Sequence, residues 1–301
     1  MSEYFITKNV ANMMKEPNPD SALDSQVVAG TIVTVEKREN DYCYVRTPDL
    51  YHGWVAQRRL VEAWDRSAYE SACVKSLFAP VYAKPDETSF LLTQLVISTR
   101  VFFTKETGNF VEIILPDKQI AYVPKTCLVD WQDSGADKNI FEEKWLNSTI
   151  DERIKIITDL GEKVVKTAMF FMGTPYLWGG NTPFGMDCSG MTQLVYGLHG
   201  LQLSRNSYMQ FDDKRFSKIE QGKALDEAVL QAGDLLVFDI KQKGKVDHIG
   251  IACGNGTFIQ TRGEMLGGGM VIDQCADAYY KRVYIGACRL SASADVNICA
   301  S

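Results

Sequence analysis

The sequence has few histidines and no closely spaced pair of cysteines, and both absences narrow the chemistry open to the protein. Only three histidines occur among 301 residues. The eight cysteines are scattered, with no C-x-x-C pair among them, so neither a zinc site nor a dithiol redox site is indicated. We therefore expect no metal and no organic cofactor, and we interpret the cysteines as buried free thiols.

Long apolar runs and an excess of positive charge are also missing. No segment approaches the ~18 unbroken apolar residues of a membrane span. The formal net charge of −6 disfavours nucleic acid or an anionic membrane as the main partner. Residues 1–5 lack the basic and then apolar pattern of a secretory signal. We expect a monomer in the cytoplasm, or a protein that is secreted or held in the cell envelope if a signal has been removed.

One cysteine stands at the predicted start of a helix. Cys188 follows a stretch rich in glycine and aromatic residues, 173–180, and precedes an apolar run that ends at Gly200. The amides and the dipole at a helix N-terminus stabilise a thiolate. Ser189 and Gly190 would let a backbone N–H approach the sulfur, where it can stabilise an oxyanion. Cys188 is therefore the candidate nucleophile.

A histidine in a strand-like segment could activate this cysteine. His248 begins the sequence His-Ile-Gly-Ile and is predicted to act as the general base. Its second ring nitrogen needs an orienting partner. Gln260 follows the hairpin signal Asn255-Gly256, so we expect it on the neighbouring strand. A lone cysteine and a lone histidine would more often be core residues, but the surrounding small residues favour the catalytic interpretation.

The N-terminal half contains an internal repeat with an offset of 68 residues. Residues 40–55 align without gaps on residues 108–123. Both copies predict short strands, with turns at Pro48-Asp49 and Pro116-Asp117. The repeat predicts two small all-β domains.

The rest of the chain changes in character. Helical periodicity extends over residues 150–172, and a second helix is predicted over 188–199. Strand-like segments follow, among them residues 248–252 and 270–272, which indicates an α+β domain. We place the domain boundaries at 1–66, 67–138 and 139–301.

The motifs of the third domain resemble those of the NlpC-type cell-wall cysteine peptidases. They are Tyr-x-Trp-Gly-Gly at 176–180, Asp-Cys-Ser-Gly at 187–190, Gly-Asp at 233–234 and His-Ile-Gly-Ile at 248–251. The resemblance covers about residues 150–290 and implies a papain-like core. It makes Cys188 the nucleophile, His248 the base and Gln260 the third polar residue, at a position where the family often has histidine. It also places Tyr176 near the oxyanion.

The repeated N-terminal domains resemble bacterial SH3-type domains. The first copy contains Gly-Trp-Val at 53–55, which is typical of the closing strand, and the second has Ala-Tyr-Val at 121–123. The expected fold is thus α+β, with two SH3-like barrels before a papain-like peptidase domain. This order resembles that of the γ-D-glutamyl-L-diamino acid endopeptidases, also called dipeptidyl-peptidase VI.

The resemblance also implies which residues would hold the substrate. Asp187 beside the nucleophile is the natural counter-ion for a free ammonium group, and Ser207 matches a substrate-binding serine of the family. Asn206 stands where aspartate is common. The other predicted contacts in this domain are Ser189, Trp178 and Arg205. Trp178 could equally be a packing residue, and most arginines are solvated surface groups.

Members of this group have a tyrosine from the first barrel that closes the pocket. Tyr51 is our choice for it, with Tyr42 and Tyr44 as rivals, although an exposed turn aromatic would look the same in sequence. We therefore expect a cysteine endopeptidase that cuts between γ-D-glutamate and meso-diaminopimelate or L-lysine in peptidoglycan peptides with a free N-terminal L-alanine, during their degradation or recycling.

Two alternatives remain open at this point. The enzyme could be a broader peptidoglycan hydrolase, either an N-acetylmuramoyl-L-alanine amidase or a wall-lytic endopeptidase. The chain could also be a non-catalytic wall-binding protein whose thiol is idle, although the presence of both Cys188 and His248 disfavours that interpretation.

Overall fold

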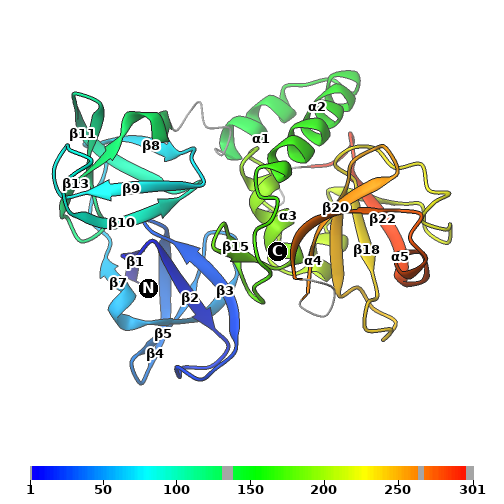
Figure 1. The fold of residues 1–301 in the computed structure, drawn as a ribbon, viewed down its shortest axis with the longest axis horizontal. Helices are drawn as coiled ribbons and strands as arrows, with labels where there is room; N and C mark the ends of the chain where they lie inside the picture. The colour runs from blue at the N-terminus through cyan, green and yellow to red at the C-terminus, as the bar shows by residue number, and fades with distance from the viewer. Residues whose placement is uncertain (1, 131–137, 264–267, 296–301) are drawn as a thin grey trace. The chain divides into compact units, whose positions relative to one another are not determined.

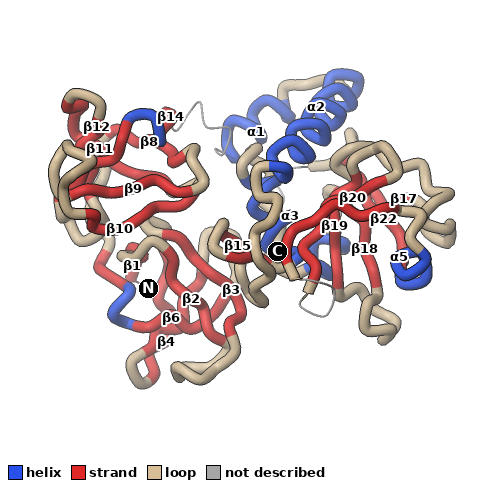
Figure 2. Tube along the Cα trace, viewed as in Figure 1, coloured by secondary structure: helices blue, strands red, loops and turns tan. Residues whose placement is uncertain are grey.

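The first part of the chain folds almost entirely into strands, and the second part combines helices with one sheet (Figures 1 and 2). The computed structural model describes residues 2–130, 138–263 and 268–295. It divides into two units, Met1–Asp137 and Lys138–Ser301. The predicted boundary before residue 139 adjoins a segment outside the described residues, so the limits 1–66, 67–138 and 139–301 stay our proposal.

The N-terminal unit contains two seven-stranded sheets with the same topology. The first consists of β1 (Ser2–Ile6), β2 (Val10–Met14), β3 (Leu23–Val28), β4 (Ile32–Glu39), β5 (Tyr42–Arg46), β6 (His52–Ala56) and β7 (Leu60–Glu62), in the order β3-β2-β6-β5-β4-β1-β7. The second consists of β8 (Glu70–Val74), β9 (Phe78–Tyr82), β10 (Leu91–Val96), β11 (Arg100–Thr107), β12 (Phe110–Ile114), β13 (Ile120–Pro124) and β14 (Leu128–Asp130), in the order β10-β9-β13-β12-β11-β8-β14. Each strand of the second sheet begins 68 residues after its counterpart, so the predicted duplication is confirmed over the whole of both SH3-like barrels.

The backbone turns are repeated as closely as the strands. A residue with positive φ follows the Pro-Asp pair in each barrel, Leu50 with φ 62° and Lys118 with φ 67°. The hairpin between the fourth and fifth strands has Asn40 with φ 51° in one copy and Gly108 with φ 59° in the other. Because only one of these four residues is glycine, the turn geometry is set by the pairing of the flanking strands and not by glycine alone.

Each barrel has its own apolar core, and one tryptophan joins the two. Val33, Val45 and Val55 are fully buried in the first barrel. In the second, Val81 and Ile113 are fully buried.

Trp64 lies between the barrels. Its ring packs on Phe5 of the first barrel and Phe102 of the second, with centroid distances of 5.3 and 6.0 Å. Its Nε1 donates a hydrogen bond to the Pro116 carbonyl at 2.8 Å. The indole therefore contacts both barrels and hydrogen-bonds the second.

The C-terminal unit is an α+β domain, as expected. Its helices are α1 (Lys138–Leu146), α2 (Ile150–Met169), α3 (Cys188–Gly197), α4 (Ser207–Phe211) and α5 (Ala278–Val283). A short hairpin joins β15 (Asn181–Thr182) to β16 (Gly185–Met186). The main sheet consists of β17 (Phe216–Ile219), β18 (Leu235–Phe238), β19 (His248–Ala252), β20 (Thr257–Arg262), β21 (Gly269–Gln274) and β22 (Tyr284–Leu290), in the antiparallel order β17-β22-β18-β19-β20-β21. Helix α3 packs against β19 and β20, which brings the predicted nucleophile to the strands of the predicted base.

Helix α2 begins where the sequence predicts and ends earlier. The Thr149 side chain accepts a hydrogen bond from the amide of Glu152, whose carboxylate accepts one from the amide of Thr149, which forms a capping box. Leu160 and Val164 lie on the buried face. The periodicity predicts Ile154 on the same face, but its side chain is 53% exposed, because the first turns of α2 extend past the core.

The described cysteines agree with the expectation of buried free thiols. Cysteines 43, 73, 127, 188, 253, 275 and 288 are free thiols, and most of them are buried. Cys299 lies outside the described residues. Among the helices that the structure describes, none has the length and apolar character needed to cross a membrane.

Candidate active site

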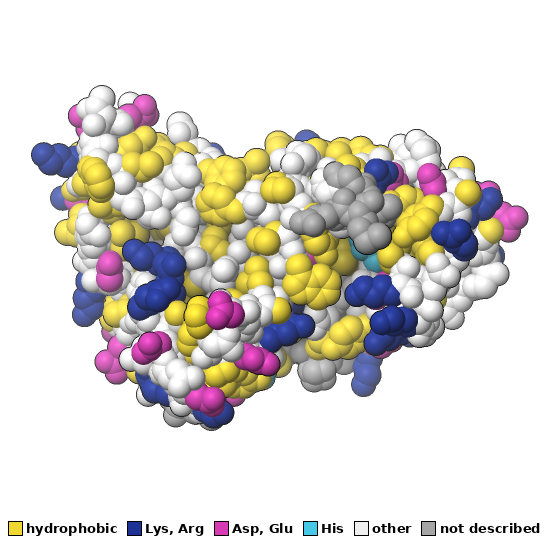
Figure 3. Space-filling model, turned by 60° about the horizontal axis from the view of Figure 1, so that its bottom comes forward, with side chains coloured by type: hydrophobic (Ala, Val, Ile, Leu, Met, Phe, Trp, Pro, Cys, Tyr) yellow, Lys and Arg dark blue, Asp and Glu magenta, His cyan; other side chains and the backbone are white. Residues whose placement is uncertain are grey.

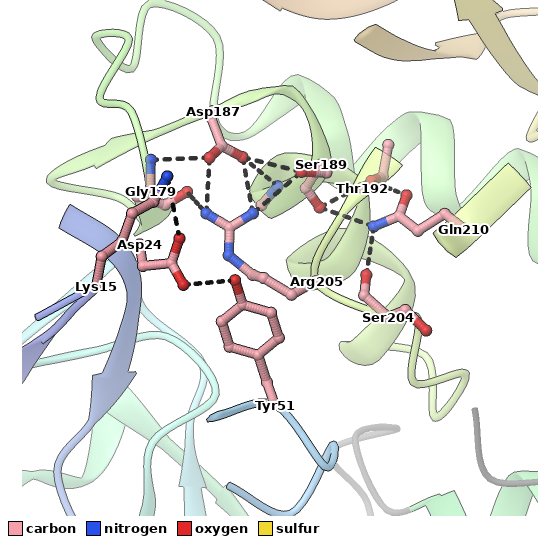
Figure 4. A network of polar contacts seen from close by, with 12 residues as sticks. Lys15, Asp24, Tyr51, Gly179, Asp187, Ser189, Thr192, Ser204, Arg205 and Gln210 are labelled. Atoms are coloured by element: carbon pink, nitrogen blue, oxygen red, sulfur yellow. Dashed lines mark hydrogen bonds and ion pairs between the residues drawn. The ribbon is translucent and has the colours of Figure 1, made fainter. Parts of the chain in front are cut away.

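Asp187 organises the start of helix α3. Its Oδ1 accepts a hydrogen bond from the Gly190 amide at 2.7 Å, and its Oδ2 accepts one from the Gly179 amide at 2.9 Å (Figure 4). The first bond caps the helix, and the second ties the preceding loop to the same carboxylate. The residue beside the nucleophile thus connects the Tyr-x-Trp-Gly-Gly loop to the helix that begins at Cys188.

Arg205 forms a buried, bidentate ion pair with Asp187. Its two terminal nitrogens donate to Oδ1 at 2.9 Å and to Oδ2 at 2.7 Å (Figure 4), and the arginine is only 2% exposed. A solvated surface position for Arg205, the ordinary alternative, is therefore wrong. The charge of Asp187 that was predicted to receive a substrate ammonium is compensated within the protein. Since each partner satisfies the other, we assign the pair to positioning α3.

Ser189 belongs to the same network. Its hydroxyl donates to Asp187 Oδ1 at 3.2 Å and accepts a bond from Arg205 at 3.0 Å. Gln210 of α4 donates to the Ser189 carbonyl at 3.0 Å. The hydroxyl that was predicted to touch substrate therefore has two partners inside the protein.

Two glycines allow the backbone to approach the nucleophile closely. A Cβ atom on Gly190 would lie 2.1 Å from the carbonyl oxygen of Gly180, and one on Gly180 would lie 2.4 Å from that of Gly185. Neither space can hold a side chain. The interpretation of these glycines as one tight approach around Cys188 is confirmed.

Cys188 lies at the first position of α3 and is 9% exposed. Burial raises the pKa of its thiol to about 12, and the Asp187 carboxylate acts in the same direction. Hydrogen bonds from the amides of Ile249 and Ser189, and the charge of Arg205, act to lower the pKa. The loss of solvation outweighs the favourable amides, so the pKa is shifted in the opposite direction to the one expected from the helix N-terminus.

The bond from Ile249 also places the nucleophile relative to the base. Ile249 directly follows His248 at the start of β19, so the sulfur lies against the strand that carries the imidazole. The predicted approach of Gln260 to this histidine is present: His248 Nε2 and Gln260 Oε1 are 2.5 Å apart. Burial lowers the pKa of His248 below its ordinary value, although the bond to Gln260 and the Asp247 carboxylate oppose this shift. Both shifts favour the neutral forms of the imidazole and of the thiol.

Asp273 and Arg262 extend this arrangement, and sequence reasoning did not find them. The Gln260 amide nitrogen donates to Asp273 Oδ2. Arg262 Nε donates to the same oxygen at 2.9 Å, and a terminal nitrogen of Arg262 binds Oδ1. Asp273 was missed because the strand over 270–272 was predicted to end before it, whereas β21 continues to Gln274.

The structure places the remaining predicted residues of this unit around α3. Tyr176 forms an isolated parallel bridge with Met186, two residues before Cys188. Ser207 is buried at the first position of α4. Trp178 is 53% exposed, with the Lys241 ammonium 5.5 Å from its ring centroid. That exposure argues against Trp178 as a core packing residue.

Two further aromatic side chains of this unit are exposed. Phe184 and Tyr208 are also exposed, at 44% and 54%. On the face drawn in Figure 3, a small area of histidine lies among exposed hydrophobic and basic side chains. Within the part of the chain that the structure describes, no three metal-ligating side chains gather into a possible metal site.

Tyr51 lies in the N-terminal unit, between β5 and β6. Its hydroxyl donates to Asp24 Oδ2 at 2.8 Å, and the Lys15 ammonium lies 3.8 Å from the other oxygen of that carboxylate (Figure 4). Tyr51 is partly buried against the core of the first barrel. It is therefore an ordered residue beside a carboxylate, and not a freely exposed turn aromatic.

Two regions of the chain match known families. Residues 173–289 match the NlpC/P60 family, and residues 13–60 match the bacterial dipeptidyl-peptidase SH3 domain. The first match includes every residue predicted for the catalytic machinery. The second lies within the first barrel.

Several known proteins are similar to this one over most of the chain. A γ-D-glutamyl-L-lysine dipeptidyl-peptidase of Bacillus cereus (strain ATCC 10987 / NRS 248) is 28% identical over 251 residues, which are 79% of this chain and 67% of that protein. Dipeptidyl-peptidase 6 of Lysinibacillus sphaericus is 26% identical over 243 residues, 76% of this chain and 79% of that protein. The crystal structure of an NlpC/P60 family protein from Bacillus cereus ATCC 10987 covers 96% of this chain and 99% of its own, with a TM-score of 0.74 at 24% identity. That likeness shows the fold.

Proposed function

Because residues 173–289 form a domain of the NlpC/P60 family of cysteine peptidases, we propose that this protein is a γ-D-glutamyl-L-diamino acid endopeptidase. It would act on peptides derived from peptidoglycan that carry a free N-terminal L-alanine. It would release L-alanyl-γ-D-glutamate and leave the diamino acid with a free amine. The diamino acid that we propose first is L-lysine, since two relatives carry that residue in their names.

The observation that carries the proposal is the arrangement of thiol, imidazole and amide. The Cys188 sulfur accepts a bond from the amide of the residue after His248, and the His248 ring is bound to Gln260 at 2.5 Å. With Gln260 accepting, the Nε2 atom of the neutral ring carries the proton and Nδ1 holds the lone pair. The ring can then receive the thiol proton.

The proposed reaction starts from the neutral pair. His248 Nδ1 takes the proton of the Cys188 thiol as the sulfur attacks the γ-carbonyl carbon. The tetrahedral oxyanion collapses, the C–N bond breaks, and the leaving amine takes the proton from His248. Water then gives a proton to His248 and attacks the thioester carbon. The C–S bond breaks, L-alanyl-γ-D-glutamate leaves with a free γ-carboxyl group, and the sulfur takes the proton from His248. In this scheme Tyr176 stays our candidate for contact with the oxyanion, and Ser207 and Trp178 stay candidates for contact with substrate.

The test is the identity of the products. The purified protein is incubated with L-Ala-γ-D-Glu-L-Lys, and the products are identified by mass spectrometry. We expect L-Ala-γ-D-Glu and L-lysine, with meso-diaminopimelate assayed in place of L-lysine in a second reaction. Release of a peptide with a free N-terminal L-alanine from a muramyl peptide would instead assign an amidase, and cleavage of intact wall would assign a wall-lytic enzyme.

Two variants separate catalysis from binding. Cys188→Ala and His248→Ala should each remove turnover and leave the far-ultraviolet circular dichroism spectrum unchanged. His199→Ala is the matched control. Its Nε2 contacts Thr167 Oγ1 at 2.9 Å, so its role is within the fold, and this variant should retain turnover. Full activity of Cys188→Ala would remove Cys188 as the nucleophile, whereas no turnover by the wild-type protein would favour a wall-binding module.

Recognition of the free amine is tested at Tyr51. We propose that the hydroxyl of Tyr51, with the neighbouring Asp24 carboxylate, binds the ammonium of L-alanine. Tyr51→Phe should raise KM for the free tripeptide several-fold and leave the slow turnover of its N-acetylated form unchanged. Tyr44→Phe serves as the control, since Tyr44 stacks on His52 and Trp54 within the barrel. Equal effects of both variants would remove Tyr51 from the site.

A further inference from the structure

Gln260 can present two chemically different ends to the catalytic ring. The oxygen and the nitrogen of a side-chain amide occupy nearly the same space, but one only accepts and the other only donates hydrogen bonds. A rotation of the amide by half a turn therefore costs no packing. Something outside the His248–Gln260 contact must decide which end faces the ring.

The choice determines where the imidazole carries its proton. With the oxygen toward His248, Nε2 is protonated and Nδ1 can accept the thiol proton. With the nitrogen toward His248, Nε2 must hold the lone pair and the proton moves to Nδ1. In that second form the ring nitrogen left for the thiol is already protonated, so the ring cannot act as its base.

Asp273 favours one of the two orientations of the Gln260 amide. An ionised carboxylate only accepts hydrogen bonds, and Asp273 Oδ2 faces the Gln260 amide group. The carboxylate is buried, at 7% exposure. Arg262 binds both carboxylate oxygens, in the charge-assisted pairing that a guanidinium makes with a carboxylate.

We propose that Asp273, paired with Arg262, is a positioning residue that selects the tautomer of His248 through the Gln260 amide. The pair forces the Gln260 nitrogen toward Asp273 and the oxygen toward His248. The functional part of this inference rests on the proposed thiol peptidase activity.

The first test is Asp273→Asn, which keeps the shape but allows either end of its own amide to face Gln260. We expect kcat to fall roughly ten- to a hundredfold, as for other residues that orient a catalytic ligand, with KM changed less than about twofold. The matched control is Asp234→Asn. Asp234 is also buried and pairs with Arg289 on the same sheet, at 2.6 and 2.7 Å. The Asp234→Asn variant should lose about as much stability as Asp273→Asn but keep the wild-type kcat.

The second test reads the tautomer directly. With three histidines in the chain, the ring nitrogens can be assigned by two-dimensional proton–nitrogen NMR with His248→Ala as the reference. We expect the Nε2–H form alone in the wild-type protein and a mixture with the Nδ1–H form in Asp273→Asn. An unchanged tautomer in that variant would overturn the proposal, whatever its activity.

A double variant offers a rescue that a structural role does not predict. In Gln260→Glu/Asp273→Asn the acceptor next to His248 is a carboxylate, which cannot be reversed, and the total charge is conserved. We expect the Nε2–H form to return and kcat to recover to within about fivefold of wild type. Failure of both recoveries would overturn the proposal.

The readouts keep this inference separate from the proposed function. If the wild-type protein does not cut the tripeptide but its tautomer changes in Asp273→Asn, the positioning role stands and the substrate is wrong. If Asp273→Asn does not fold, Arg262→Lys gives the same measurement at a partly exposed side chain. It should populate some Nδ1–H form, and its absence there would also count against the pair.

Discussion

The two barrels of the N-terminal unit share strand order and turn positions with different side chains, whereas the C-terminal unit depends on particular residues. Met13 corresponds to Val81 and Tyr44 to Glu112, yet the strands start 68 residues apart throughout. Around Cys188, by contrast, Arg205 has two bonds to one buried carboxylate. Main-chain pairing tolerates substitution because every residue offers the same amide and carbonyl. A buried ion pair does not, because removing either member leaves an unpaired charge.

The comparison also separates two uses of glycine. Gly108 serves a positive φ in an open turn, where a Cβ atom would meet nothing within 4 Å. Gly190 has helical backbone and serves close approach to Gly180. The first need can be met by asparagine, as Asn40 shows at the equivalent position. The second can be met by glycine only, since any Cβ would overlap a carbonyl oxygen.

The largest effect that we expect follows from this difference. Gly190→Ala should destabilise the C-terminal unit by more than about 4 kcal/mol, because the new methyl group meets backbone and not a movable side chain. Gly108→Ala is the matched control and should cost only about 1 kcal/mol for the positive φ. Urea denaturation followed by circular dichroism measures both. Similar costs for the two variants would erase the distinction drawn between the units.

The cost in stability of breaking an ion pair should also differ strongly between the two units. Arg205→Met leaves the Asp187 carboxylate buried and unpaired, which should cost about 3–5 kcal/mol. In the first barrel, Lys37 and Glu39 form a pair with side chains 59% and 45% exposed. Lys37→Met should cost less than about 1 kcal/mol. The free energies of unfolding of the two variants and of the wild-type protein measure both costs. A cost for Arg205→Met below that range would mean that water or another donor replaces the guanidinium.

The reactivity of Cys188 tests the neutral pair. Since only the thiolate is alkylated and burial raises the pKa to about 12, Cys188 should react with iodoacetamide at pH 7 on the order of a thousandfold more slowly than a free cysteine of pKa ~8.5. The rate should keep rising with pH beyond ~8.5. Mass spectrometry of the peptide that contains Cys188 follows the reaction. A rate that levels off below pH 7 would instead indicate a preformed thiolate–imidazolium pair.

The smallest effect concerns the paired turns of the barrels. Lys118 has φ 67° and an exposed side chain, so Lys118→Gly should stabilise the second barrel by about 0.5–1 kcal/mol. Leu50→Gly at the equivalent position should gain less, because the Leu50 side chain is 39% exposed and its partly covered apolar surface would be lost. Thermal unfolding compares the two. A loss of stability in Lys118→Gly would show that the turn does not carry backbone strain.

Much of the fold could be predicted because it follows from local patterns. The strand that begins at His248 was predicted with both of its ends, and Gln260 was predicted beside it from the hairpin signal, although the left-handed residues of that turn are Gly254 and Gly256. The short helices α4 and α5 were not predicted. With five and six residues they are too brief for helical periodicity to appear.

The contacts of the site were harder to predict than its members. Asp187 and Arg205 were both singled out, but their pairing depends on how the chain after α3 returns to its start, which no local pattern records. The direction of the Cys188 pKa was predicted wrongly because the dipole of a helix can be read from sequence and the loss of solvent cannot. The sequence contains the list of polar groups, and the fold determines which of them lose water.

The protonated state of Cys188 has a consequence for the lifetime of the protein. Peroxides attack thiolates much faster than thiols, and exposed sulfur faster than buried sulfur. A nucleophile that loses its proton only when substrate arrives exposes little thiolate to an oxidant between turnovers. We expect the resting protein to survive oxidative stress that would convert a permanently ionised cysteine to its sulfinic acid.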